Sequence, residues 1–168
     1  MKTMIVLAMH GAPPNDFPRE ELTEFLSLHS RMEHAGEVVP AEIRSRYEEL
    51  EKKIRSFPRT PKNDPFHEGS MELAEGLRQA TNMDVMLGFN EFCAPNLDDA
   101  LRVAVGSGAK KVIVVTPMLT RGGEHAERDI PAAIERARQR HPGIEFVCAW
   151  PFPAFEIAQF LAGRVKLF

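Results

Sequence analysis

The most informative stretch of this chain is Val114-Val115-Thr116-Pro117-Met118-Leu119-Thr120-Arg121-Gly122-Gly123-Glu124-His125-Ala126-Glu127-Arg128-Asp129-Ile130-Pro131. A β-branched run ends at Thr116-Pro117, and a glycine pair then leads to His125 and a helix start. This order predicts a buried strand that opens into a polar loop at its carboxyl end. Ligands bind at that end of open α/β sheets, so His125 is the first candidate functional residue.

Apolar runs and amphipathic stretches alternate on both sides of this stretch. Four short apolar runs predict strands over Thr3–Met9, Met83–Phe89, Lys111–Thr116 and Ile144–Trp150. Helical spacing predicts helices over Phe66–Thr81, Pro95–Gly106, Ala126–Arg140 and Pro153–Gly163. Such alternation is typical of parallel strands joined by right-handed crossovers. We therefore predict an α/β fold with a four-stranded parallel sheet, ordered 2-1-3-4, and helices on both faces. In the first of these helices we expect four inward-facing side chains, Met71, Leu73, Ala74 and Leu77.

The segment Arg19–Lys62 interrupts this alternation after the first strand. Apolar residues recur at helical spacing in Arg19–Met32 and in Pro40–Phe57, which predicts two amphipathic helices. We therefore predict one domain, residues 1–168, with a helical insertion at residues 19–62. Three roles remain open for the insertion: a solvated cap on the core, a lid over the site, or a dimer surface.

Composition narrows the class of protein. The 168 residues carry a formal net charge of −3, which argues against a nucleic-acid partner. No apolar run approaches membrane-spanning length, and the first residues lack a signal-peptide pattern. Cys93 and Cys148 have neither metal-site nor disulfide spacing, so we expect buried free thiols. We expect a cytoplasmic protein that binds neither nucleic acid nor membrane.

Three polar residues follow three of the predicted strands. They are His10, Glu91 and His125. Parallel strands in register would bring them to one edge of the sheet. Two imidazoles and a carboxylate suit a divalent metal, and an imidazole also suits proton abstraction near neutral pH. A single histidine at a strand end is more often structural, whereas convergence of all three favours a functional site.

Other polar residues are weaker candidates. Four more histidines are present: His29 and His34 in the insertion, His67, for which a surface position is expected, and His141 at a helix end. The cations that could meet an anionic ligand are Arg19, Lys62, Arg121 and Arg128.

Two stretches resemble the class II chelatases of tetrapyrrole biosynthesis, the sirohydrochlorin cobaltochelatase/ferrochelatase family. Met9-His10-Gly11 after an apolar strand is one, and Pro117–Pro131, with His-x-x-x-Asp-Ile-Pro at its end, is the stronger. Between them, Glu91–Leu101 resembles the segment that carries the family's carboxylate. The resemblance covers Thr3–Gly11 and about Pro65–Val165, but not the insertion.

The resemblance implies a half-size chelatase fold, whose short members pair as homodimers. It implies insertion of Co²⁺ or Fe²⁺, with Ni²⁺ as a further option, into a sirohydrochlorin-type ring in cobalamin or siroheme biosynthesis. The metal is then a substrate, and no organic cofactor is expected. His10 and His125 would hold or deliver the metal and accept pyrrole protons, and Glu91 would assist.

A tetrapyrrole also needs a cleft that holds the macrocycle. The resemblance places Arg121, Gly122 and Gly123 in substrate binding. Four apolar side chains could line the cleft, with core packing as the equal alternative for each: Phe17, Phe89, Met118 and Leu119. Two other readings stay open. One is a non-catalytic tetrapyrrole- or metal-binding protein on the same fold. The other, a histidine phosphatase, is disfavoured because Met9 stands where that class has arginine.

Overall fold

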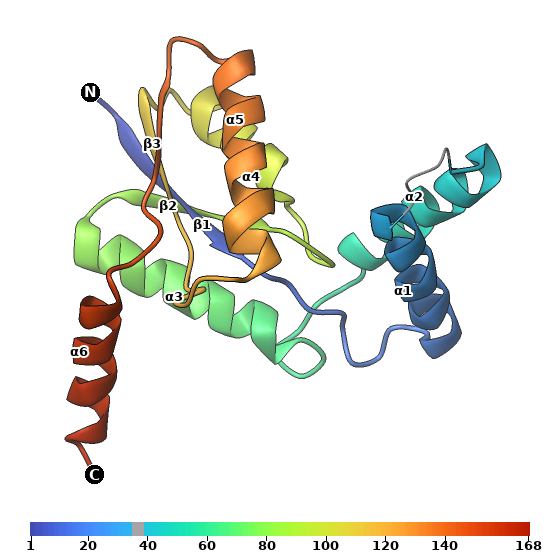
Figure 1. Cartoon of the computed structure of the whole chain (residues 1–168), viewed down its shortest axis with the longest axis horizontal. Helices are drawn as coiled ribbons and strands as arrows, with labels where there is room; N and C mark the ends of the chain where they lie inside the picture. The colour runs from blue at the N-terminus through green and yellow to red at the C-terminus, as the bar shows by residue number, and fades with distance from the viewer. Residues whose placement is uncertain (35–38) are drawn as a thin grey trace.

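The sheet has the predicted topology. A computed structural model describes residues 1–34 and 39–168 (Figure 1). Its four strands are β1 (Thr3–Met9), β2 (Asp84–Phe89), β3 (Lys111–Val115) and β4 (Glu145–Cys148). All neighbours pair in parallel in the order β2-β1-β3-β4, which confirms the predicted order. Because β1 is central, the ends of β2 and β3 lie on either side of its own carboxyl end.

Helices cover both faces of the sheet, as predicted. The α-helices are α1 (Arg19–His34), α2 (Ala41–Arg55), α3 (Pro65–Thr81), α4 (Leu97–Gly106), α5 (Ile130–Arg140) and α6 (Ala154–Val165). Figure 1 shows α4 and α5 together on one face and α3 on the other, while α6 extends away from the sheet. Within the described residues, no helix has the length and apolar character that a membrane span requires.

Two hydrophobic cores lie on the two faces. The larger one joins β1 and β3 to α4 and α5, with Val6, Leu101 and Ile134 almost fully buried. The smaller one lies under α3, where Leu7, Met9, Phe89 and Cys93 pack against Ala74 and Leu77. This burial on both faces explains why the β1 sequence is apolar throughout.

The prediction of which α3 side chains face the core is wrong for two of the four residues. Met71 and Leu73 are 51% and 44% exposed, whereas Ala74 and Leu77 pack against the core. The buried face of the helix follows Ser70, Ala74 and Leu77, which are spaced at i, i+4 and i+7. Met71 and Leu73 therefore fall on its flanks.

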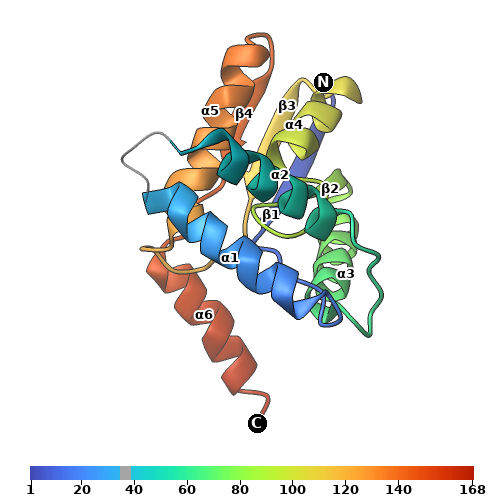
Figure 2. The same ribbon diagram turned by 90° about the vertical axis from the view of Figure 1, so that its right-hand side faces the viewer.

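The insertion contains the two predicted helices, α1 and α2, which lie side by side (Figure 2). Phe25, Leu28 and Leu50 form a small core between them. Arg46 joins α2 to Glu24 of α1 through two hydrogen bonds of 2.9 and 2.7 Å. Residues 35–38, part of the predicted insertion, lie outside the described residues.

The helix predicted over Ala126–Arg140 begins differently. Its first turn is a π-helical turn, η1 (His125–Asp129), and α5 follows at Ile130. The amide of Ile130 donates to the carbonyl of His125, five residues earlier. Pro131 lacks an N–H and cannot form the next α-helical bond, so the wider turn loses little there. Turns of this kind occur frequently at functional sites.

Candidate metal site

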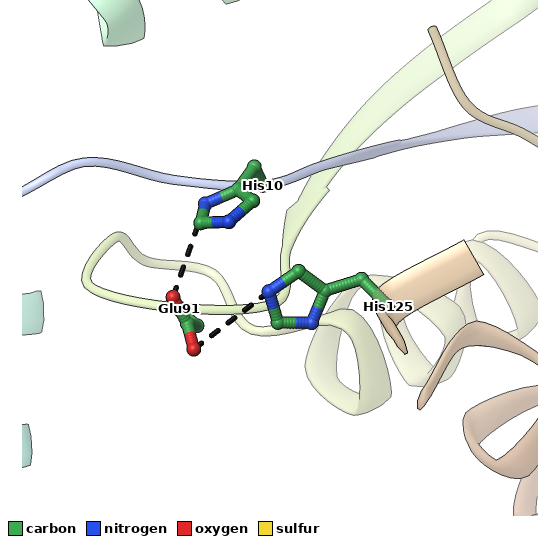
Figure 3. A group of neighbouring side chains, drawn as sticks. All are labelled: His10, Glu91 and His125. Carbon is green, nitrogen blue, oxygen red and sulfur yellow. Dashed lines mark ion pairs between the residues drawn. The ribbon is translucent and has the colours of Figure 1, made fainter. Parts of the chain in front are cut away.

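The three predicted site residues lie together at the carboxyl edge of the sheet (Figure 3). His10 follows β1, Glu91 follows β2, and His125 opens η1. Glu91 Oε2 is 3.8 Å from His10 Nδ1, and Glu91 Oε1 is 3.7 Å from His125 Nε2. The two imidazole rings meet edge to face, with their centroids 4.5 Å apart. Ligand atoms from the three residues all lie within 4.8 Å of one another.

A glycine makes the close approach of two strand ends possible. Gly11 has φ of +105°, and a Cβ there would lie 1.9 Å from the carbonyl oxygen of Glu91. Only glycine fits this contact and adopts this φ without strain. The amide of Glu91 donates to the carbonyl of His10 at 2.9 Å, and Asn90 donates to Met9 in the same way. The backbone after β2 is thereby bound alongside His10.

His125 is oriented by a second carboxylate. Its Nδ1 lies 2.7 Å from Asp129 Oδ2, one turn along η1, so that Nε2 faces Glu91. The contact with Glu91 raises the pKa of His125 to about 9, with burial opposing and Asp129 adding to the increase. The same contact with His125 lowers the pKa of Glu91, although burial opposes it. Burial would raise the pKa of Asp129, but His125 and Arg128 together lower it.

The donor set fits a divalent metal ion. Two ligand atoms that each lie about 2.1 Å from one ion are roughly 3–4 Å apart, which is close to the separations found here. Two imidazole nitrogens and one carboxylate oxygen suit borderline metals such as Co²⁺, Fe²⁺ and Ni²⁺. Three protein ligands leave coordination positions for water or a reacting molecule. The carboxylate on Nδ1 of His125 is the usual outer partner of a metal-binding histidine.

A cavity of about 380 Å³ lies beside the triad. Glu91 and His125 form one part of its wall, and the insertion supplies another through His29, Glu51 and Arg55. The arginines of this wall are paired with carboxylates, as Arg55 is with Glu51 at 3.0 Å. The cavity is therefore polar and charged, and the insertion borders it directly.

Most of the predicted substrate-binding residues lie outside the lining of this cavity. Arg121, Gly122 and Gly123 are exposed on the loop before η1, and Met118 and Leu119 are half-buried. Phe89 is 1% exposed, belongs to the smaller core and also borders the cavity. Among the described residues that line this cavity, Phe89 is the one member of the predicted set.

The loop before η1 is held by its own contacts. Arg121 lies 3.3 Å from Glu127 and places its guanidinium 6.0 Å from the ring centre of Trp150. Gly122 has φ of +90° and donates to the same Glu127. Their role in substrate binding stays a prediction.

The weaker candidates are dispersed. His67 stacks on Phe89 with ring centres 5.5 Å apart, and His141 caps the end of α5. Phe17 is buried against Phe57. His29 reaches Glu91, whereas the side chain of His34 lies outside what the structure describes.

Of the four candidate cations, Arg19 and Lys62 are exposed. Arg128 borders the cavity and pairs with Glu124 and Asp129.

Sequence reasoning missed Arg55, which supports the loop that carries Glu91. β2 ends at Phe89, so the carbonyl oxygens of this loop need partners outside the sheet. Arg55, in the last turn of α2, donates to the carbonyl of Asn90 at 3.0 Å and to that of Cys93 at 2.6 Å. One guanidinium thus spans both ends of the loop.

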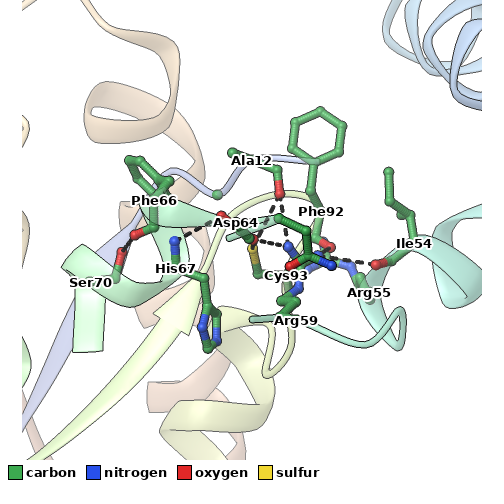
Figure 4. Close-up of polar contacts among 12 residues, drawn as sticks. Ala12, Ile54, Arg55, Arg59, Asp64, Phe66, His67, Ser70, Phe92 and Cys93 are labelled. Carbon is green, nitrogen blue, oxygen red and sulfur yellow. Dashed lines mark hydrogen bonds and ion pairs between the residues drawn. The ribbon is translucent and has the colours of Figure 1, made fainter. Parts of the chain in front are cut away.

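Arg59, just beyond α2, was missed as well (Figure 4). It donates to the carbonyls of Ala12 at 3.0 Å and Phe92 at 2.5 Å, and it forms an ion pair with Asp64. Asp64 is 2% exposed and also caps α3, accepting from the amide of His67 at 2.9 Å. The sequence Asp64-Pro65 is typical of a helix start and could have indicated the capping role of Asp64. Arg55 and Arg59 lie in no sequence motif that predicts their contacts with backbone carbonyls.

The matches to known proteins agree with this geometry. A sequence profile of the CbiX family matches residues 62–166. This chain belongs to the CbiX family. The match begins at the end of the predicted insertion, so Glu91 and His125 lie within the matched residues, whereas His10 and nearly all of the insertion lie before them. The predicted kinship with the short class II chelatases is thereby confirmed.

The curated relatives include proteins named for cobalt and proteins named for iron. A sirohydrochlorin cobaltochelatase of Priestia megaterium is 37% identical over 70 residues, which cover 42% of this chain and 22% of that protein. A sirohydrochlorin ferrochelatase of the same organism is 30% identical over 89 residues, covering 51% of this chain and 33% of the relative. This CbiX-family chain therefore spans well under half the length of these two relatives.

A solved structure supports the fold. The putative cobalamin (vitamin B12) biosynthesis CbiX protein of Marinobacter aquaeolei VT8 is similar over 99% of this chain and 96% of its own. The TM-score is 0.53 at 20% sequence identity. At that identity the likeness concerns the fold alone, and it agrees with a half-size chelatase architecture.

Proposed function

We propose that this CbiX-family chain is a chelatase that inserts Co²⁺ or Fe²⁺ into a sirohydrochlorin-type tetrapyrrole. The observation that carries the proposal is the open three-donor site formed by His10, Glu91 and His125. Relatives named as cobaltochelatase and ferrochelatase support both the reaction class and the choice of metals.

The side chains account for the chemistry of insertion. Placing a divalent ion in the ring releases two pyrrole N–H protons, so the site must hold the ion and also accept protons. His125 and His10 lie beside each other. A deprotonated imidazole can hold the ion, and once the ion has moved to the ring the same nitrogen can take up a released proton. Three protein ligands hold the ion without closing its coordination sphere, which lets the ring nitrogens replace the remaining ligands. Glu91 offsets the charge of the ion while it transfers.

The proposal is tested by absorption spectroscopy. Purified protein, Co²⁺ and sirohydrochlorin are mixed, and formation of the metallated ring is compared with the spontaneous rate. His125→Ala is expected to abolish the acceleration, and His10→Ala to remove nearly all of it, with both variants folded. His141→Ala, at the far end of α5, is the matched control and should retain the wild-type rate. Absence of acceleration by wild-type protein would favour the non-catalytic binding protein instead.

A homodimer is part of this proposal. Helix α6 leaves Phe155, Phe160, Leu161 and Val165 exposed, and apolar surface of this kind often marks a protein interface. A second copy would cover it, and a tetrapyrrole would gain further walls. Light scattering after gel filtration measures the mass directly, and a monomer at all concentrations would contradict this assignment.

The cellular setting proposed is the cytoplasm. Cys93 and Cys148 are both free thiols, and free thiols persist in reducing compartments. Localisation of the tagged protein by fractionation tests this point.

A further inference from the structure

The insertion contributes a histidine to the surroundings of Glu91. His29, on α1, places Nε2 3.4 Å from Glu91 Oε1, which is closer than either triad histidine comes to that carboxylate. Its side chain is 26% exposed and borders the same cavity. Within the described residues His29 is not a member of the compact three-donor group. It therefore reaches the site through the carboxylate.

The ring of His29 is fixed by its own helix pair. Phe25 lies one turn earlier on α1 and stacks on the ring at 5.9 Å, and Tyr47 of α2 stacks on it at the same distance. The Tyr47 hydroxyl lies 3.1 Å from Nδ1. A hydroxyl that donates to Nδ1 leaves the proton on Nε2, where it faces Glu91. Local packing thus sets the direction of this imidazole, with Nε2 towards Glu91.

A metal-ligating carboxylate is itself held by hydrogen bonds from neighbouring groups, and His29 contacts the Oε1 atom of Glu91 that also faces His125. Outer partners of this type orient the ligand, and their loss typically weakens metal binding by about 10–100-fold. Arg55 and Arg59 already fix the backbone on both sides of Glu91. His29 is placed to fix its side chain.

We propose that His29 is a positioning residue that orients the Glu91 carboxylate, making the α1–α2 insertion an integral part of the metal site. This inference rests on the proposed function, since it assumes that Glu91 is a ligand. It assigns to the insertion a role distinct from a cap, because the contact is made with a ligand and not with the core.

The test measures Co²⁺ binding to the metal-free full-length protein, by visible absorption and by competition with a chromophoric chelator. His29→Phe keeps the aromatic stacking and removes both nitrogens, and we expect it to weaken Co²⁺ binding by about 10-fold. His29→Gln can still donate to Glu91, and we expect it to stay within about threefold of wild type. The KM for Co²⁺ should rise in His29→Phe more than kcat falls.

A matched variant separates positioning from stability. Arg46→Ala removes the two hydrogen bonds to Glu24 of α1, and neither residue lines the cavity, so it should leave Co²⁺ affinity unchanged. Equal loss in Arg46→Ala and His29→Phe, or wild-type affinity in His29→Phe, would overturn the inference. Failure of the wild-type protein to bind Co²⁺ is a separate result, and it would refute the metal site itself.

Discussion

Two helical segments extend from the sheet, and they are attached in opposite ways. The α1–α2 pair buries Phe25, Leu28 and Leu50 in its own small core. It binds the loop of Glu91 through Arg55, and Arg59 just beyond α2 adds a second contact. Helix α6 has no buried residue. Figure 1 shows both segments outside the layers formed by the sheet and its covering helices. Their positions alone therefore do not reveal that they are attached differently.

An appended segment becomes part of a site when it satisfies the backbone of a neighbouring loop. Carbonyl groups of an irregular loop must find donors, and the insertion supplies them beside a proposed ligand. Helix α6 instead presents apolar side chains to solvent, which fits association with another chain. Polar contacts to the loop and exposed apolar surface therefore indicate two different roles for the two segments.

The largest effect is expected at the junction of the insertion. Arg59→Ala leaves Asp64 buried without its cation, so the free energy of unfolding should fall by about 3–5 kcal/mol. Urea unfolding followed by circular dichroism measures this change. Lys53→Ala removes the more exposed ion pair with Glu21 and should cost less than about 1 kcal/mol. Similar losses in both variants would show that Arg59 is no special attachment point.

The second largest effect is a pH dependence of the unfolding free energy, and it arises at His125, which lines the cavity that the insertion borders. The pKa of His125 is about 9 in the fold, against an ordinary value of 6.5. A raised pKa stabilises the fold fully below pH 6.5, and this stabilisation is lost as the pH rises towards 9. The loss is on the order of 3 kcal/mol for the metal-free protein. Urea unfolding midpoints, measured at several pH values with a chelator present, report this loss. In His125→Gln the midpoint should change much less with pH. A wild-type profile that matches the variant would contradict the charge assignment.

The smallest effect is expected in α6. Phe160 is 67% exposed, so Phe160→Asp should change the unfolding free energy of the monomer by less than about 0.5 kcal/mol. The same variant should abolish the dimer, because a charge would enter the interface. Dilute urea unfolding and light scattering report the two quantities separately. A large loss of monomer stability would mean that α6 packs on its own chain, which would remove the contrast with α1–α2.

Several features could be predicted from the sequence because local patterns encode them. The continuous apolar run of β1 indicates burial on both faces, and alternation with helices gives the parallel order. Parallel register then brings His10, Glu91 and His125 to one edge, whatever the details of the loops. The inward side of α3 was read less well, since Met71 and Leu73 are hydrophobic but lie on its flanks.

The strand order, the edge that carries the site and the family could therefore all be inferred from the amino-acid sequence. The contact between the insertion and that site could not, and it became visible in the folded chain. His29 meets Glu91 across 62 positions of sequence, and Arg59 meets Phe92 across 33. Contacts of this kind depend on how one helix pair is placed against one loop. Periodicity records which face of an element is buried, but it carries no information about which distant group that face will meet.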